Sequence, residues 1–174
     1  MLNKSKKILS QEESLYNYIL LLSRNKIFYT TFNLQDTFQN RINLIFIHSS
    51  FFLIKNKLKD KNQINKVFYQ SFFDMIFKKI ELNMREIGYG DVVVNKNMKY
   101  LVKTFYNILN QCENYTDKDN SLKNDFFKDY LTQNNDKIKP NTSTIISYFD
   151  QFQAFCFDLS SDSVLKGKIN FNYK

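Results

Sequence analysis

The sequence has one histidine and two cysteines, which is too few for the usual catalytic and metal-binding sites. Histidine-based catalysis needs a base oriented by a third group, and metal sites usually need three or four protein ligands. Cys112 and Cys156 are far apart, and Cys112 falls in an apolar stripe at helical spacing. We interpret both as reduced, buried thiols, typical of a cytosol-like compartment. These shortages predict a protein that is not an enzyme and that has no metal, cofactor or small-molecule substrate.

Proline and glycine are also scarce, and the one proline and three glycines form no run that would mark a domain boundary. We expect a single domain over residues 1–174, with an N-terminal tail at 1–10 and a C-terminal tail at 160–174. The longest apolar run, residues 42–54, is too short and too polar for a membrane-spanning helix. The basic start of the chain lacks the apolar core of a signal peptide. The sequence therefore predicts a protein that does not cross a membrane.

Apolar residues recur at helical spacing along most of the chain, whereas strand-like alternation is confined to residues 92–94. There is also no internal repeat that would indicate a solenoid. We therefore predict an all-α, single-domain bundle of about six helices. The predicted helices cover about residues 11–24, 34–57, 63–84, 95–112, 122–131 and 141–156.

The segments between these helices are polar or aromatic. An aromatic connector is expected at residues 24–32, and loops are expected at 55–66 and 133–139. The C-terminal tail is expected to contain a short turn ended by Gly167 and then an extended segment. Short polar side chains that can accept bonds from the first helical amides stand at Ser10, Asn33, Asn95 and Asn141.

Two of the three glycines, Gly88 and Gly90, lie between the third and fourth long helices. Glycine adopts the backbone angles of a tight turn at little cost, so we predict a glycine-containing elbow there. We expect Arg85 to pair with a nearby carboxylate and Asp91 to accept bonds from turn amides. Glu86 and Asp91 are candidates for acid–base chemistry only if they share a cleft.

The formal net charge is +8, which favours an anionic partner such as nucleic acid, the ribosome or an acidic membrane surface. Lys96, Lys99 and Lys103 fall on one predicted helix face with Tyr100 and Tyr106, a pattern suited to RNA phosphates and bases. A solvated helix face has the same pattern, and the abundance of Lys, Asn, Ile, Phe and Tyr is also typical of a compositional bias. A basic helical RNA- or ribosome-binding module is therefore the alternative function.

The chain contains 18 phenylalanines and 11 tyrosines, more rings than a core of six helices readily hides. Rings left exposed would favour an apolar groove for another polypeptide or helix. Compositional bias alone accounts for the same number. The ring content therefore predicts a partner-binding groove without locating it.

Two ordered blocks of residues stand out. The first contains Ser23-Arg24, Phe28-Tyr29, Asp36-Thr37, Arg41 and His48, and the second contains Met84-Arg85-Glu86-Ile87-Gly88-Tyr89-Gly90-Asp91, then Lys96 to Lys99 and Phe105-Tyr106. Together they resemble the ubiquinol-cytochrome c chaperone family, which assists assembly of the cytochrome bc complex. The resemblance covers about residues 15–115 well and the last third by its helical pattern. It implies an all-helical, non-enzymatic factor that holds newly made cytochrome b before assembly of the complex.

The same resemblance implies the partners and the location. The client would be nascent or newly inserted cytochrome b, and the ribosome and a second chaperone subunit would be further partners. A bacterial member would be cytoplasmic, with peripheral contact at the inner face of the cytoplasmic membrane. A eukaryotic member would lie in the mitochondrial matrix.

The candidate partner-binding residues come from the two blocks and the helix that follows. Gly88 and Gly90 would shape the elbow, whereas Arg85 and Asp91 would fix it or bind the client. Helix capping and corner pairing account for the same residues equally well. For His48, a haem ligand or a switch is an alternative to a helix histidine bonded to a neighbouring group. The candidate set is Phe28, Tyr29, Asp36, Thr37, Arg41, His48, Arg85, Gly88, Gly90, Asp91 and Lys99.

Overall fold

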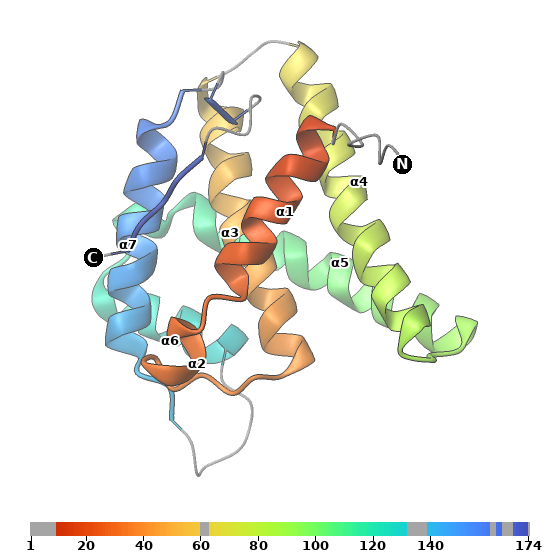
Figure 1. Ribbon diagram of the computed structural model, residues 1–174. Helices are drawn as coiled ribbons and strands as arrows, with labels where there is room; N and C mark the ends of the chain where they lie inside the picture. Colours follow the sequence, from red (N-terminus) through yellow and green to blue (C-terminus); the bar gives the residue numbers. More distant parts are fainter. Residues whose placement is uncertain (1–9, 60–62, 132–138, 161–162, 165–168, 174) are drawn as a thin grey trace, which may run out of the picture.

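The chain folds as an α-helical bundle in the computed structural model (Figure 1), which describes residues 10–59, 63–131, 139–160, 163–164 and 169–173, with backbone alone at 56–59 and 63–65. None of these residues lies in a strand, so the predicted all-α class is confirmed. The elements are α1 (Gln11–Ser23), α2 (Ile27–Thr30), α3 (Phe38–Lys59), α4 (Gln63–Glu86), α5 (Asp91–Glu113), the 3₁₀ helix η1 (Tyr115–Asp117), α6 (Asn120–Leu131) and α7 (Thr142–Asp158).

Helix α3 is the centre of the bundle. It packs against α1, α5, α6 and α7, and its side chains from residue 42 to residue 52 are all buried. A helix covered on all sides is apolar all round, which explains why the longest apolar run of the chain is a core helix. Figure 1 shows α1 crossing in front of α3 and α5 crossing behind it, with α7 on one flank and α4 on the other. Within the described residues, no helix is long and apolar enough to span a bilayer.

The start of α1 matches its prediction, because the Ser10 side chain accepts a bond from the amide of Glu13 at 3.2 Å. The predicted cap at Asn33 is wrong. Asn33 has a φ of 55° and its side chain donates to the carbonyl oxygen of Lys139 at 3.0 Å, so it turns the chain instead of starting a helix. Helix α3 begins at Phe38, and the connector before it contains the short helix α2.

The elbow between α4 and α5 is built by Gly88. The amide of Gly88 donates to the carbonyl of Arg85 at 3.0 Å, and the amide of Tyr89 donates to that of Met84 at 3.1 Å. These two bonds form a Schellman motif, which requires the left-handed conformation that Gly88 adopts with a φ of 101°. The predicted glycine elbow is therefore present at the predicted place.

The predicted start of the next helix at Asn95 is wrong, because α5 begins four positions earlier at Asp91. Gly90 is the N-cap residue in an extended conformation, with φ −71° and ψ 159°. Asp91 places a carboxylate in the first turn, next to the positive end of the helix dipole. Residues 92–94, which alternate like a strand, form that first turn, and Val94 is buried in the core.

The predicted loop at 55–66 is shorter than expected, because α3 continues to Lys59 and α4 begins at Gln63. The predicted loop at 133–139 and the turn at Gly167 lie largely or wholly outside the described residues. The C-terminal segment is not a free tail. The rings of Phe171 and Tyr173 lie 5.4 and 5.3 Å from the Tyr148 ring of α7, and residues 169–173 carry no helix.

The core takes in most of the rings and leaves several exposed. The rings pack mostly edge to face around Phe28, His48 and Tyr148, an arrangement that fills a core densely. All the Phe and Tyr residues fall within the described chain. The exposed rings among them are Phe38, Tyr89, Tyr100 and Tyr106. The other exposed large apolar residues are aliphatic, at Leu21, Val67, Leu82, Ile87, Val92, Val93 and Leu122.

Candidate partner-binding groove

A hollow of about 300 Å³ lies between α1, the start of α3 and the end of α4. Each helix contributes side chains three or four positions apart, so that one face of each helix forms one wall. The floor is apolar, and the exposed side chains of Arg24, Arg41 and Glu86 provide charges. The lining residues are Tyr16, Leu20, Arg24, Phe38, Arg41, Ile42, Ile45, Ile80, Asn83, Glu86 and Ile87. We call this hollow the α1/α3/α4 groove.

One predicted block forms the edge of the groove near α3. The Arg41 guanidinium forms two bonds with the Asp36 carboxylate, at 2.5 and 2.7 Å. These bonds hold the pKa of Asp36 below its usual value. Tyr29 lies beside Arg41 and donates to the carbonyl of Ser23 at 3.1 Å, and burial raises the pKa of Tyr29. Thr37 caps α3, since its hydroxyl accepts from an amide one turn later.

The second predicted block lies at the end of α4 and in the elbow, and part of it lines the groove. Arg85 donates to Glu81 at 3.0 and 2.9 Å and also to Asp91, so it connects α4 with the first residue of α5 across the elbow. The predicted pairing of Arg85 with a nearby carboxylate is confirmed. Glu86 and Ile87 line the α1/α3/α4 groove, whereas Asp91 does not. Because Glu86 and Asp91 do not share this groove, it does not provide the cleft that paired acid–base chemistry requires.

Phe28 and His48 are fully buried and have no access to a partner in this structure. The Nδ1 of His48 donates to the carbonyl of Leu44 at 2.6 Å, and its Nε2 accepts from the Tyr148 hydroxyl at 2.9 Å. A carbonyl can only accept, so Nδ1 carries the proton. Burial lowers the pKa of His48 to about 4, which keeps the ring neutral at pH 7.

These contacts correct two predictions about the core residues. With both ring nitrogens of His48 engaged inside the core, neither is directed at a haem iron, and the interpretation as a bonded helix histidine is confirmed. Phe28 and His48 therefore lie beneath the surface, where they pack the connector against α3 and α7.

Lys99 lies apart from the groove, on the exposed side of α5. The exposed side chains of that helix also include Lys96, Lys103, Tyr100 and Tyr106. We call this surface, together with Val92 and Val93 in the first turn, the outer face of α5. The candidate set thus divides among the groove edge, the elbow, the outer face of α5 and the core.

The sequence did not identify most of the residues that line the groove. Leu20, Phe38, Ile45 and Ile80 belong to apolar stripes, and a stripe does not show which of its members will line a hollow. One residue of the sequence did indicate the position of the groove. Ile87 is an aliphatic residue in a turn whose other side chains are mostly charged.

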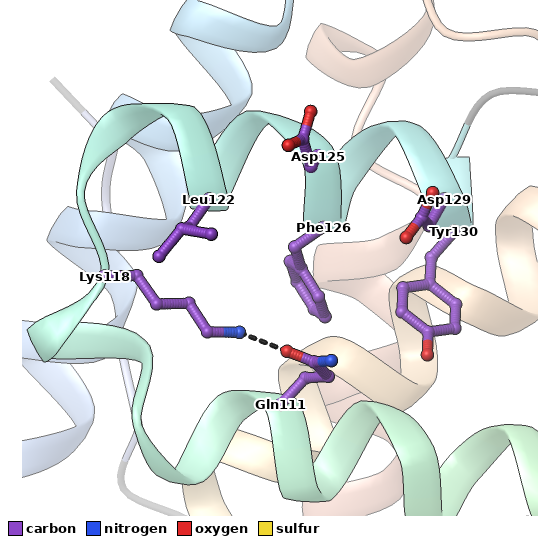
Figure 2. A pocket seen from close by; sticks show the side chains of 7 residues that line it. All are labelled: Gln111, Lys118, Leu122, Asp125, Phe126, Asp129 and Tyr130. Atoms are coloured by element: carbon purple, nitrogen blue, oxygen red, sulfur yellow. Dashed lines mark hydrogen bonds between the residues drawn. The ribbon is translucent and has the colours of Figure 1, made fainter.

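A second, smaller hollow of about 140 Å³ lies between α5, η1 and α6 (Figure 2). Figure 2 shows the Lys118 side chain extending across it to the Gln111 amide, to which its amino group donates. The Lys118 amino group also lies 5.2 Å from the centre of the Phe126 ring. The remaining lining residues are Leu122, Asp125, Asp129 and Tyr130, so none of the predicted residues lies here.

The fold defines an all-α protein with a hollow between three of its helices. Within the described residues, no group of histidine, cysteine, aspartate and glutamate side chains is placed to hold a metal ion. The chain belongs to the ubiquinol-cytochrome C chaperone family, whose pattern matches residues 30–171. The predicted family is therefore confirmed, and the match includes the elbow and two of the three helices of the groove.

The fold is also that of a solved relative. The crystal structure of the Cbp3 homolog from Brucella abortus is similar to this chain with a TM-score of 0.78. The two sequences are 23% identical, and the alignment covers 93% of this chain and 88% of that chain. At this identity the likeness shows a shared fold. A search for curated relatives found no matching sequence.

Proposed function

We propose that this protein is a non-enzymatic chaperone that holds newly made cytochrome b before its assembly into the ubiquinol-cytochrome c reductase complex. The client is held in the α1/α3/α4 groove. Family membership supports a role in assembly of the ubiquinol-cytochrome c reductase complex. The groove supports the proposal that the client is bound as a polypeptide segment between the three helices. Newly inserted cytochrome b as client, the ribosome and a second chaperone subunit as further partners, and a cytoplasmic or matrix location rest on the family alone.

The observation that carries the proposal is the meeting of both predicted blocks at one hollow, which is lined by apolar and charged side chains. Arg41 comes from the first block and Glu86 and Ile87 from the second, yet all three line the same groove. The side chain of Phe38 is 41% exposed there. Covering apolar surface of this kind is favourable by roughly 25 cal/mol per Å². An apolar or amphipathic helix of the client fits a groove with three helical walls.

The charged pairs give the groove a fixed shape. Arg41 is held by Asp36, and Arg85 is held by Glu81 and Asp91 on the far side of the elbow. All these groups are exposed, where ion pairs contribute little to stability. Their contribution is to fix the side chains near the groove before binding. Binding of the client then costs little conformational entropy.

The proposal is tested by placing charge in the groove. The variant Leu20→Asp/Phe38→Asp should reduce capture of newly made cytochrome b by the tagged chain by about tenfold or more, because a carboxylate would be buried against an apolar helix. Spectroscopic cytochrome b in the membrane should fall as well, with its message unchanged. The matched control is Leu21→Asp/Val67→Asp, since Leu21 is adjacent to Leu20 but lies outside the groove.

Urea unfolding of each purified variant separates loss of binding from loss of fold. Normal capture and normal levels of the reductase complex in a folded groove variant would contradict the proposal. Equal losses in the groove variant and the control would contradict the location of the client site.

A further inference from the structure

The elbow between α4 and α5 carries aliphatic and aromatic side chains that the described residues leave largely or partly exposed. Ile87 is 63% exposed and Val92 is 82% exposed, and Tyr89 and Val93 are each 45% exposed. All four lie within seven consecutive residues at the corner where the two long helices meet, at one extremity of the molecule (Figure 1). We call these four side chains the elbow tip.

The outer face of α5 continues from this tip and carries positive charge. At about 100° per residue, its members fall within roughly 140° of the helix circumference. The members are Val92, Val93, Lys96, Lys99, Tyr100, Lys103 and Tyr106, and all are exposed. This arc contains three lysines and no carboxylate.

Carboxylates do lie near the elbow tip. Asp91 precedes Val92 by one residue, which places it about 100° around the helix from Val92, and its carboxylate is bonded to Arg85. Glu86 lies on the groove side of the elbow, among the residues that line the groove. Glu113 closes α5 at its other end. The positive arc of α5 is therefore flanked by carboxylates but not interrupted by them.

We propose that the elbow tip and the outer face of α5 bind an anionic phospholipid surface, with the tip inserted among the headgroups and the lysines lying on the phosphates. Exposed aliphatic side chains at a corner gain free energy by entering the membrane interface. Lysines near an acidic bilayer add attraction, and tyrosine is enriched at the level of the headgroups. Bound RNA would use the lysines and the tyrosine rings, but it would leave Ile87, Val92 and Val93 uncovered. The aliphatic tip therefore favours lipid over RNA.

This inference does not depend on the identity of the client, but it orients the groove. Ile87 belongs both to the elbow tip and to the lining of the α1/α3/α4 groove. A chain bound to a bilayer through its elbow would hold that end of the groove next to the membrane surface.

A tryptophan reporter tests the insertion directly, because the chain contains no tryptophan. The full chain carrying Tyr89→Trp should show a blue-shifted emission when mixed with vesicles of phosphatidylglycerol and phosphatidylcholine, and quenching by brominated lipids. The matched reporter Leu122→Trp, at a position that is 54% exposed on α6, should not shift. No shift for Tyr89→Trp, or a shift for Leu122→Trp alone, would overturn the proposal.

Vesicle sedimentation tests the lysines. The variant Lys96→Gln/Lys99→Gln/Lys103→Gln should bind the acidic vesicles about tenfold or more weakly, since each lysine near an anionic surface contributes substantially. The variant Val92→Ser/Val93→Ser should bind several-fold more weakly. The charge-matched control Lys26→Gln/Lys128→Gln/Lys139→Gln removes exposed lysines outside this face and should bind more tightly than the α5 triple variant.

The same proteins should be titrated with an unstructured single-stranded RNA by filter binding. If the chain does not bind acidic vesicles but binds RNA through Lys96, Lys99 and Lys103, the lipid proposal is overturned in favour of RNA binding. If the two triple variants bind vesicles equally, the attraction is due to net charge alone and the proposed face is wrong.

Discussion

The aromatic core around His48 and the elbow around Gly88 both contain candidate residues predicted from the sequence, but the two regions place them in opposite environments. Phe28 and His48 are fully buried, and both nitrogens of the histidine have partners. At the elbow, Ile87 and Val92 are largely exposed, and the bonds of Arg85 are to carboxylates on the same corner. The candidate residues predicted from the sequence therefore include side chains that fill the core and side chains that lie at the surface.

This difference predicts different responses to substitution. A buried ring that fills a core is costly to remove, because the cavity left behind closes only in part. An exposed side chain contributes little to the free energy of folding, so its removal should leave stability nearly unchanged and affect only the binding of a partner. Stability measurements therefore separate the two regions before any client is present.

The largest effect is expected for Phe28→Ala. The ring lies 5.3 Å from that of Phe32 and 4.8 Å from that of Tyr148, and removing it should lower the free energy of unfolding by about 3–5 kcal/mol. At the elbow, Ile87→Ser should change it by no more than about 0.5 kcal/mol. Urea denaturation monitored by circular dichroism gives both values. Similar losses in the two variants would mean that the elbow belongs to the core.

The next effect is a pH dependence that comes from His48. Its pKa is lowered from 6.5 to about 4 by burial, so the unfolded chain binds more protons than the folded chain between these values. The contribution of this residue to stability is complete above pH 6.5 and is lost as the pH falls to about 4, by roughly 3 kcal/mol in total.

The comparison variant for this pH dependence is His48→Gln. Its unfolding free energy should change less between pH 7 and pH 4 than that of the unaltered chain, so the two curves should converge on acidification. Curves that run parallel over this range would show that His48 is protonated as readily in the folded chain as in the unfolded one.

The smallest stability effect separates the two glycines of the elbow. Gly88→Ala should lower the free energy of unfolding by about 1 kcal/mol, because its φ of 101° is strained for any residue with a Cβ. Gly90→Ser should be neutral or stabilising by a few tenths of a kcal/mol, since Gly90 has ordinary N-cap angles and open space around it. Thermal unfolding of the two variants measures the difference, and equal losses would contradict the assigned turn geometry.

Much of the fold could be predicted because most helices carry both an apolar period and a boundary signal. Ser10 and Asn141 cap α1 and α7 where the sequence places them. The errors occur where tertiary contacts override a local signal. Asn33 bonds to the backbone of Lys139, far away in sequence, and α5 starts at Asp91 because Gly90 completes the turn and Val94 is taken into the core.

The candidate site could be predicted only in part. Charged and glycine residues at a corner are visible in sequence, so the elbow and the pairing of Arg85 with a carboxylate were predicted. The pair of Asp36 with Arg41 was not predicted, although both residues were in the candidate set. The walls of the α1/α3/α4 groove were not predicted either, because Leu20 and Ile80 belong to the same apolar helical stripes as the core residues, and Ile80 is itself buried. The burial of His48 also could not be predicted from the sequence, because it depends on a contact with Tyr148, a hundred residues later in the chain.

Site-specific photo-crosslinking in living cells tests the groove most directly. A photoreactive phenylalanine analogue would replace Phe38 in the groove or, as the matched position, Leu122 on α6, while cytochrome b is being made. The groove account predicts a crosslink to newly made cytochrome b from position 38 and none from position 122. A crosslink from position 122 with none from position 38 would contradict it.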